Sequence, residues 1–461
     1  MSRRNETVNR NRRGIAGLIF NMLLTGLSVF IFYHFYYEGY RYSTHYYFRG
    51  NQLLILLYVS LLVLFLSLYG GFRIRQSRTR ELAFSFLMAD VMTNAIIYAS
   101  FCLVARRMLP VFDILLIIAI QMVTALILYI LARILIPMME PSIPALFIRG
   151  DAVWEDDVLP KFDKRRTSYV PREIVFGSEG WDRLRAAMEP YEAVLVGDVS
   201  PQLRQEIIGY CFRTGRKVLL VPNMTDIVVG SAQPMVMGDY LLYDLNTQGN
   251  DLPYLAAKRA LDILASAVGL LVLSPLMLIT ALCIKLQDGG PVFYRQIRLT
   301  RAGRMFKLTK FRSMIVDAES QTGAVLAGKT DSRITRVGKV IRATRIDELP
   351  QLWNILIGDM TLVGPRPERP EFYEKICREY PEFDYRLKMK AGLTGYAQLY
   401  GKYNTSFADK ARLDMYYIQH ASFLWDLQMI LYTLKIIFIR ESTEGVEQPE
   451  EAEKQEETAV H

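Results

Sequence analysis

Two adjacent carboxylates, Asp347 and Glu348, stand in the stretch RIDELPQLWNILIGDMTLVGPRP, residues 345–367, at the start of an apolar helical pattern. Their simplest role is a helix cap, because aspartate is a favoured N-cap residue and glutamate suits the first turn. Pro350 agrees with a helix start, since its missing N–H would be unpaired there in any case. The residues around the pair, however, also favour a chemical role.

The surroundings of the pair are suited to phosphate. The N-terminus of a helix attracts anions through its free N–H groups and its dipole, and arginine forks match the geometry of phosphate oxygens. Gly364 allows close backbone approach, and the prolines of LVGPRP stiffen the turn. The cations expected at the site are Arg342, Arg345, Arg366 and, from the basic stretch 292–312, Arg312.

A carboxylate in such a site has two candidate jobs. It can attack a phosphorus atom and form an acyl phosphate, or it can hold a divalent cation that neutralises phosphates. Adjacent helical residues point about 100° apart, so Asp347 and Glu348 need not share one job. One can be the nucleophile and the other a metal ligand or a base.

The composition indicates a membrane protein and excludes several other classes. The 461-residue chain carries a formal net charge of +8, yet 51% of it is hydrophobic and 12% aromatic. Its four cysteines form no C-x-x-C pair, which argues against a zinc site or a disulfide framework. With only four histidines, two of them flanking the first apolar segment and one at the C-terminus, catalysis or metal binding by histidine is not expected.

Four apolar stretches near the length needed to cross a bilayer open the chain: 14–33, 53–69, 82–105 and 109–136. Arginine-rich flanks place the N-terminus, the second loop and everything after residue 136 in the cytoplasm. No small-residue cleavage site is seen, so the first stretch is expected to stay as an anchor. Within the third stretch, Asp90 and Asn94 are expected to hydrogen-bond between helices rather than mark a lipid or ion path.

Residues 141–250 predict an α/β module. PALFI, EAVLVG and KVLLVP are typical of buried strands, and PQLRQEIIGYCFRTG predicts an amphipathic helix that ends at Gly215. The order strand, helix, strand indicates a Rossmann-like unit. The turn RGDAVWED has one glycine and no dinucleotide fingerprint, so a structural, regulatory or dimerising role is favoured over NAD binding.

The apolar run 261–286 is long enough to be a fifth span, but two features favour a re-entrant helix. Pro275, directly after Ser274, interrupts the helical hydrogen bonds in mid-run. Both flanks are basic, so a span would place one of them outside against the charge rule. The following stretch, 292–312, has cations and no acidic residue, which next to a membrane segment favours anionic lipid headgroups or phosphates over nucleic acid.

The C-terminal part adds a helix and a tail. The apolar segment 422–439 is interrupted by Asp426, Gln428 and Lys435, and therefore suits a helix in the membrane interface better than a span. Residues 441–461 are acidic and polar, which predicts disorder.

Four stretches in this order resemble the bacterial sugar transferase family, the monotopic polyprenyl-phosphate hexose-1-phosphate transferases. They are KRALDILASAVGLLVLSPLMLIT, GGPVFYRQIRLTRAGRMFKLTKFRSM, DSRITRVGKVIRATRIDELPQLWNILIGDMTLVGPRPERPEF and KAGLTGYAQLYGKYN. The resemblance covers residues 252–440. Four spans and a Rossmann-like module ahead of it resemble the long members, which are usually undecaprenyl-phosphate glucose or galactose phosphotransferases.

The resemblance implies a reaction and roles for particular residues. The family's Asp-Glu dyad matches Asp347 and Glu348. The aspartate attacks the β-phosphate of a UDP-sugar, UMP leaves, and undecaprenyl phosphate takes the phosphosugar, with Mg²⁺ held by the dyad. The remaining matches are Arg342 and Arg366 in the phosphate motifs, Ser274 and Pro275 in the re-entrant helix break, and, as weaker candidates for nucleotide contacts, Gln398 and Asp414. Ala391 and Tyr396 depart from the family's Pro-Gly-x-Thr-Gly-Trp-Ala-Gln loop.

These expectations combine into a membrane α plus α/β architecture. It comprises a four-span transmembrane bundle (1–140), a Rossmann-like cytoplasmic module (141–250), a monotopic catalytic domain (251–440) with a re-entrant helix at 261–286, and a disordered acidic tail (441–461). We expect a multi-pass protein of the bacterial inner membrane, catalytic on the cytoplasmic face, that forms a homodimer and binds UDP-sugar, undecaprenyl phosphate and anionic lipid but no nucleic acid. A flippase for the lipid-linked sugar and a non-enzymatic assembly scaffold are the rival interpretations.

Overall fold

The computed structural model describes residues 14–36, 49–150, 167–245, 251–316, 331, 333–401 and 405–437. The chain forms two compact units, residues 1–221 and 222–461, and each is described by itself. The tail at 441–461 lies outside the described residues.

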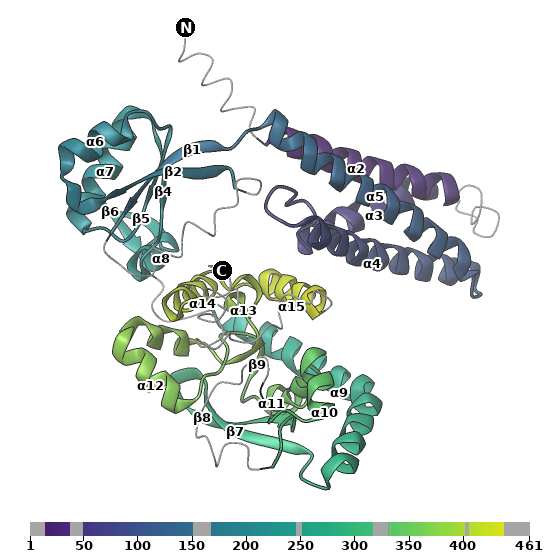
Figure 1. Ribbon diagram of the computed structural model, residues 1–461. Helices are drawn as coiled ribbons and strands as arrows, with labels where there is room; N and C mark the ends of the chain where they lie inside the picture. Colours follow the sequence, from purple (N-terminus) through teal and green to yellow (C-terminus); the bar gives the residue numbers. More distant parts are fainter. Residues whose placement is uncertain are drawn as a thin grey trace, which may run out of the picture. The chain divides into compact units, whose positions relative to one another are not determined.

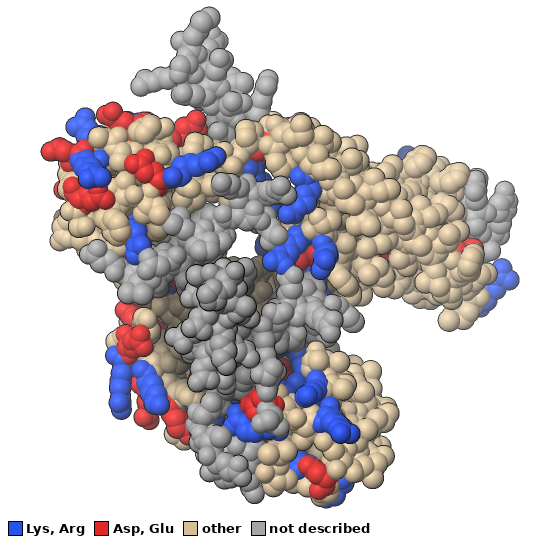
Figure 2. Space-filling model, viewed as in Figure 1, with Lys and Arg blue, Asp and Glu red and all other residues tan. Residues whose placement is uncertain are grey.

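The first unit begins with long apolar helices at the four predicted stretches. These are α2 (Ile15–Phe35), α3 (Gly50–Leu68), α4 (Thr79–Ala105) and α5 (Val111–Met139), which pack side by side in Figure 1. Each is long and apolar enough to cross a membrane. On the face shown in Figure 2 the bundle is mostly uncharged along its length. These helices fit a membrane protein, as the composition predicts.

A buried polar cluster joins the helices of this bundle. Asn94 Nδ2 donates to Asp90 Oδ1 at 2.7 Å within α4 and to Gln121 Oε1 of α5 at 3.3 Å. Gln121 Nε2 in turn donates to Tyr58 Oη of α3 at 2.7 Å and to Ser28 O of α2 at 2.6 Å. The predicted interhelical hydrogen bonding is thus confirmed for Asn94, with Gln121 as the link that the sequence did not single out, whereas the hydrogen bonds between Asn94 and Asp90 lie within α4.

The α/β part of the first unit has a four-stranded parallel sheet in the order β2-β1-β3-β4. Its strands are β1 (Ile143–Arg149), β2 (Tyr169–Phe176), β3 (Ala193–Val196) and β4 (Lys217–Leu220), with helices α6 (Trp181–Met188) and α7 (Pro201–Thr214). Helix α7 starts at the N-cap Ser200 and ends, as predicted, at Gly215 with φ 71°. The parallel α/β region is therefore confirmed.

The single glycine after β1 has a packing role. A Cβ on Gly150 would lie 1.8 Å from Asp198 O, beyond the end of β3, so only glycine permits this approach of the two segments. This close contact accounts for the glycine without any dinucleotide.

Residues 222–245 were expected in the α/β module but belong to the second unit. Helix α8 (Met224–Gly230) is followed by Ser231, whose Oγ donates to Gln419 Oε1 at 3.2 Å. The antiparallel hairpin β5 (Gln233–Met237) and β6 (Tyr240–Asp244) comes next, and every residue of both strands is exposed.

In the part of the second unit that the structure describes, helix α9 (Leu252–Asp288) and three small strand pairs form the framework. Besides β5–β6, these are β7 (Phe293–Leu299) with β8 (Met305–Phe311), and β9 (Thr361–Val363) with β10 (Gly392–Thr394). The other helices are α10 (Arg336–Ala343), α11 (Gln351–Ile357), α12 (Pro370–Glu379), α13 (Tyr396–Tyr400), α14 (Phe407–His420) and α15 (Phe423–Ile437), with 3₁₀ segments η6 (Ile346–Glu348) and η7 (Pro381–Lys388). Helix α15 lies where the sequence predicts one.

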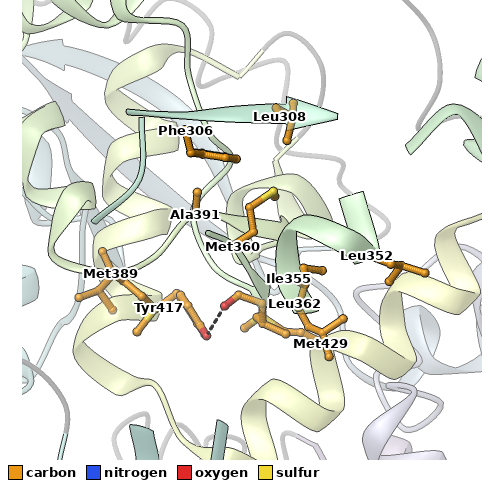
Figure 3. Packing of buried hydrophobic residues seen from close by; sticks show 12 residues of the cluster. Phe306, Leu308, Leu352, Ile355, Met360, Leu362, Met389, Ala391, Tyr417 and Met429 are labelled. Atoms are coloured by element: carbon orange, nitrogen blue, oxygen red, sulfur yellow. Dashed lines mark hydrogen bonds between the residues drawn. The ribbon is translucent and has the colours of Figure 1, made fainter. Parts of the chain in front are cut away.

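The core of the second unit lies among β8, α11, β9, α14 and α15 (Figure 3). Phe306 and Leu308 of β8 point from one side toward Ile355 of α11 and Met360. Tyr417 of α14 closes the other side and donates its hydroxyl to Val363 O at 3.3 Å. This core fixes β9, which leads directly into the Gly364-Pro365-Arg366 turn.

Helix α9 is continuous through Pro275, and Ser274 explains how. Pro275 lacks the N–H that would bond to Leu271 O, and Ser274 Oγ donates to that carbonyl at 2.7 Å instead. Both halves of α9 contact the same unit: Gly269 lies against Leu352, and Ile284 packs with Phe311.

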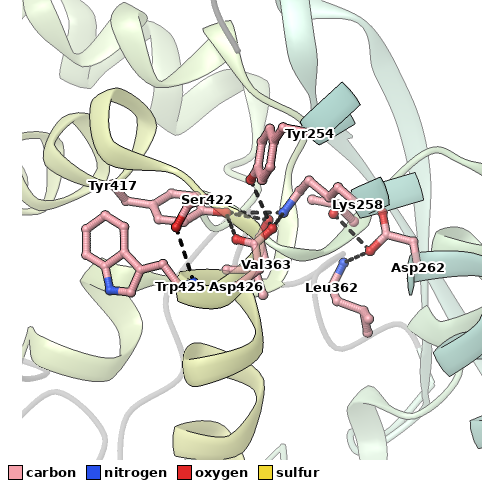
Figure 4. Close-up of polar contacts among 10 residues, drawn as sticks. Tyr254, Lys258, Asp262, Leu362, Val363, Tyr417, Ser422, Trp425 and Asp426 are labelled. Atoms are coloured by element: carbon pink, nitrogen blue, oxygen red, sulfur yellow. Dashed lines mark hydrogen bonds and ion pairs between the residues drawn. The ribbon is translucent and has the colours of Figure 1, made fainter. Parts of the chain in front are cut away.

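A buried ion pair fixes the start of α9 to α15 (Figure 4). Lys258 Nζ lies 2.7 Å from Asp426 Oδ2, and both side chains are almost wholly buried. Asp426 also accepts hydrogen bonds from Tyr254 at 2.9 Å and Tyr417 at 2.5 Å. One turn further along, Asp262 Oδ1 accepts the N–H of Leu362 in β9 at 2.9 Å.

Asp426→Asn is expected to destabilise the second unit by about 3–5 kcal/mol, because it leaves the Lys258 charge buried without its partner. Thermal unfolding of the purified protein in nanodiscs measures the loss. Asp409→Asn is the control, since Asp409 pairs with Arg412 in a more exposed place on α14. An equal, small effect of both substitutions would contradict the prediction.

Candidate active site

Asp347 and Glu348 lie in η6, a single 3₁₀ turn between α10 and α11. Arg345, just before the turn, has a φ of 55°, a left-handed conformation that costs a non-glycine residue about 1–2 kcal/mol. Helix α11 begins after Pro350, which is its N-cap, with no side-chain cap hydrogen bond. The helix-cap interpretation of Asp347 was therefore wrong, because the carboxylates lie in a 3₁₀ turn ahead of the helix, whose N-cap is Pro350.

Glu348 is surrounded by three cations from three parts of the chain. Its Oε1 accepts from Lys310 Nζ of β8 at 3.2 Å and from Arg366 Nη2 at 3.4 Å, while Oε2 lies 3.8 Å from Arg345 Nη1. Burial alone would raise the pKa of Glu348, but these cations outweigh it and lower the pKa to about 2. Glu348 is thus an ionised counter-charge at neutral pH.

Asp347 differs from its neighbour in both charge and environment. Burial, and then the charge of Glu348, raise the pKa of Asp347 to about 6, although Lys310, Arg342 and Arg366 act in the opposite direction. The two adjacent carboxylates therefore have pKa values far apart, a pattern typical of groups with different roles. Asp347 is the one that can exist in either protonation state near neutral pH.

Lys310 is the site residue that sequence reasoning missed. It lies on the same face of β8 as the buried Phe306 and Leu308, so the period of two along a strand points its side chain inward. Burial lowers its pKa, and the charge of Glu348 opposes that shift. The alternation of apolar residues in MFKLTKF is the signal that could have identified it.

Arg312, two residues after Lys310, has a structural role. Its Nη2 is paired with Asp288 at the end of α9, and a Cβ on Gly290 would collide with its guanidinium at 2.1 Å. Arg312 therefore holds the end of α9 against β8. The prediction that it binds phosphate has no support from this placement.

The turn that carries Arg366 depends on glycines. Gly364 N donates to Thr394 O at 2.8 Å, and a Cβ on Gly364 would lie 2.3 Å from Lys390 O. A Cβ on Gly395 would in turn lie 2.2 Å from Gly364 O. Close backbone approach was predicted for Gly364, and the structure shows it toward the β10 segment.

Gln398 and Asp414 lie in different surroundings. Gln398 Oε1 on α13 is buried and has no hydrogen-bond partner within the described residues. Asp414 on α14 lies with one carboxylate oxygen 2.8 Å from Arg386 Nη2. Burial raises the pKa of Asp414 to about 6, with Arg386 opposing the shift. Asp414 thus belongs to a second charged cluster around Arg386.

The donor set for a metal is small. Within the described residues, no group of three or more His, Cys, Asp or Glu side chains could hold an ion. Mg²⁺ is, however, commonly bound through one or two carboxylates together with substrate phosphates. Asp347 and Glu348, adjacent in one turn, fit that mode of binding.

Comparison with known proteins identifies the family of this chain. Residues 253–440 match the family described as Bacterial sugar transferase. A putative undecaprenyl-phosphate N-acetylgalactosaminyl 1-phosphate transferase of Bacillus subtilis is 52% identical over 134 residues, which are 29% of this chain and 74% of the relative. The chain therefore belongs to the bacterial sugar transferase family.

Two further relatives are longer than the region they share. The UDP-N-acetylgalactosamine-undecaprenyl-phosphate N-acetylgalactosaminephosphotransferase of Aeromonas hydrophila is 44% identical over 199 residues, 42% of this chain and 47% of the relative. The UDP-glucose:undecaprenyl-phosphate glucose-1-phosphate transferase of Klebsiella pneumoniae is 34% identical over 269 residues, 57% of this chain and 55% of the relative. The match thus spans about half the length of each of these two.

Proposed function

We propose that the protein is a phosphoglycosyl transferase that moves a hexose 1-phosphate from a UDP-sugar to undecaprenyl phosphate and releases UMP. The observation that carries the proposal is the carboxylate pair of η6, with a raised pKa on Asp347, inside a group of cations. The family to which the chain belongs and the names of its relatives support the same reaction. It would be the first membrane step of exopolysaccharide, capsule or O-antigen assembly.

The reaction proceeds in two displacements at one phosphorus atom. A carboxylate oxygen of Asp347 attacks the β-phosphorus, the bond to the bridging oxygen breaks, and UMP leaves with the electron pair. A phosphate oxygen of undecaprenyl phosphate then attacks the aspartyl-phosphosugar, the bond to Asp347 breaks, and the carboxylate is restored. The product is undecaprenyl diphosphosugar.

The cations around the pair act on the charge of the phosphates. Arg366, Lys310 and Arg342 offset the negative charge of the diphosphate, which would otherwise repel the attacking carboxylate. Glu348 keeps Lys310, Arg345 and Arg366 at their places. Mg²⁺, when held by Asp347 and Glu348, supplies further neutralisation of phosphate charge.

Glucose is the sugar we propose, with galactose next and an N-acetylated sugar after it. The alignment with the Klebsiella pneumoniae glucose enzyme supports this order, because at 269 residues it is longer than the 253–440 family region. The N-acetylgalactosamine relatives share more identity over shorter stretches. Rates measured with a panel of UDP-sugars therefore have to decide which sugar is transferred.

The proposal is tested by UMP release from purified protein in nanodiscs with Mg²⁺, across UDP-glucose, UDP-galactose and their N-acetylated forms. The expected result is repeated turnover that requires undecaprenyl phosphate and favours one sugar, with at most one UMP released per chain when the lipid is left out. No release with any sugar would reject the reaction. ATP-independent transbilayer movement of the lipid product would then point to a flippase, and capture of assembly proteins alone to a scaffold.

The rate is expected to depend on the protonation of Asp347. Only its carboxylate can attack, and its pKa is raised to about 6, so kcat/KM should fall about tenfold per unit of pH below that value and level off above it. Initial rates of UMP release between pH 4.5 and 8.5 measure the profile. A rate that stays constant down to pH 4.5 would contradict the assignment of Asp347.

We propose that α9 is a re-entrant helix and that the second unit works at the cytoplasmic face of the bacterial inner membrane, with anionic lipid against exposed cations of the basic stretch 292–312 such as Arg295 and Lys307. Both halves of α9 return to the same unit, and its large apolar side chains are exposed, among them Leu264, Leu271, Val272, Leu278 and Leu286. Single cysteines just before 261 and just after 286 should both react only from the cytoplasmic side. Periplasmic labelling after 286 would show a span.

We propose that the protein is a homodimer. The hairpin β5–β6 exposes large apolar residues on both faces, including Val236, Tyr240 and Leu241, and contains no lysine or arginine that would draw it to anionic lipid. Its open edges can pair with those of a second copy. Native mass measurement in nanodiscs should give the mass of two chains, and Leu241→Asp should give one. A monomeric wild type would end the proposal.

A further inference from the structure

A second charged cluster lies behind Arg366. The Arg366 guanidinium contacts Glu348, whereas its backbone carbonyl accepts a hydrogen bond from Arg386 Nη2 of η7 at 2.9 Å. At this point the surface has a shallow hollow, whose lining includes Thr300, Pro365, Arg366, Glu368, Tyr373 and Arg386. Arg366 therefore belongs both to the carboxylate site and to this hollow, which we call the Arg386 hollow.

Cations and carboxylates both gather around the Arg386 hollow. Arg386 lies 2.8 Å from Asp414 and 3.8 Å from Glu368. Burial lowers the pKa of Arg298 to about 10, and the charges of Arg366 and Arg369 add to that shift although Glu368 opposes it. Burial also lowers the pKa of Lys410, with Arg386 and Arg366 contributing. The cations of the cluster thus lie close enough together to disfavour one another's charged forms.

Two buried donors in this cluster lack acceptors. Arg386 is only 6% exposed, and its Nε has no hydrogen-bond partner within the described residues. The same holds for Arg298 Nε, although Arg298 Nη2 donates to Gln296. A buried unsatisfied donor on a charged group is costly. An anion rich in oxygen acceptors in the hollow would supply the missing acceptors and lessen the repulsion among the neighbouring cations.

We propose that the Arg386 hollow binds the α-phosphate of the nucleotide donor and holds it in UMP after the first displacement. This inference rests on the proposed function. In an in-line displacement the leaving group lies on the opposite side of the phosphorus from the nucleophile. Arg366 lies between the carboxylates and the hollow, so a β-phosphate at its guanidinium would direct the α-phosphate toward Arg386.

The alternative source of a phosphate is the lipid acceptor. None of the residues that line the hollow comes from α9, the helix whose exposed apolar side chains mark the membrane side of the unit. A phosphate on a polyprenyl chain would approach from that side. The hollow is therefore assigned to the soluble nucleotide.

Binding of UMP to the full-length protein in nanodiscs tests the assignment, by equilibrium dialysis with inorganic phosphate as a second probe. Arg298→Gln is expected to weaken UMP binding about tenfold, since a hydrogen bond to a charged group is lost. Arg386→Lys keeps the positive charge but loses the guanidinium fork, and it is also expected to weaken UMP binding about tenfold. Arg304→Gln is the matched control, because that exposed arginine pairs with Asp359 outside the hollow.

Kinetics separate the two sources of phosphate. The KM for the UDP-sugar should rise about tenfold in Arg298→Gln, whereas the KM for undecaprenyl phosphate should change less than about twofold. A rise in the lipid KM instead would assign the hollow to the acceptor and overturn the proposal. Unchanged UMP binding in Arg298→Gln and in Arg386→Lys, both of them folded, would also overturn the proposal. If the wild type released no UMP from any UDP-sugar, the proposed function would fail, but UMP binding would still test the hollow.

Discussion

Replacing Asp347 with asparagine is expected to abolish UMP release and lipid transfer, by ~10³-fold or more, while the protein still folds and inserts. The amide has the shape of the carboxylate but cannot form the acyl phosphate. Because η6 owes its position to backbone hydrogen bonds with Arg345 O and Ile346 O, the turn itself should persist. Loss of rate without loss of thermal stability is the expected combination.

The same variant tests the covalent intermediate directly. Wild type incubated with the UDP-sugar alone should gain the mass of one phosphohexose, and Asp347→Asn should gain none. Asp359→Asn serves as the control. Asp359 pairs with Arg304, and the substitution removes an equal charge from a neighbouring turn. Near-normal turnover in Asp347→Asn would refute the nucleophile.

The elements that the sequence predicted well are those whose signal is local. The apolar stretches became α2 to α5, because length and hydropathy alone define such helices. Strand β2 was missed because it is an edge strand, and its segment YVPREIVF contains a proline and two charged residues. Nothing within these eight residues specifies that β2 pairs with β1; the pairing arises only when the sheet assembles.

The residues of the candidate site show the same difference between local sequence signals and tertiary packing. Arg345 precedes the carboxylates by a few residues, and Arg366 follows them within one motif, so spacing suggested both. Lys310 comes to Glu348 only through the packing of β8 on α11, across 38 residues of chain. Arg312 has the same charge and lies two residues away, but it pairs with Asp288 at the end of α9 instead. Charge identified the basic stretch, and tertiary packing decided which of its members reaches the carboxylates.

The helix-cap prediction failed for a related reason. Asp, Glu and Pro are the residue types that start a helix, and the pattern cannot distinguish an α-helical first turn from a preceding 3₁₀ turn. The left-handed Arg345 sets that turn, and an arginine gives no sequence signal for a positive φ. Backbone strain of this kind is concentrated at functional sites.

Glu348→Gln is expected to lower kcat about 10²–10³-fold through the cations that Glu348 holds. Lys310, Arg345 and Arg366 would lose their shared counter-charge and repel one another, so the phosphates would meet a disordered group of cations. Thermal stability should also fall, since buried positive charge is left without its partner. Steady-state UMP release and thermal unfolding in nanodiscs measure the two effects, and Glu371→Gln, on an exposed residue that pairs with Arg369, is the control.

The pH profile of this variant distinguishes an electrostatic role of Glu348 from a purely structural one. The charge of Glu348 is one cause of the raised pKa of Asp347, second only to burial. Removing that charge should lower the pKa of Asp347, so the residual rate of Glu348→Gln should reach half its plateau at a lower pH than the wild type does. A midpoint that stays at the wild-type value or moves upward would show that the two carboxylates do not interact, and the division of roles between them would have to be abandoned.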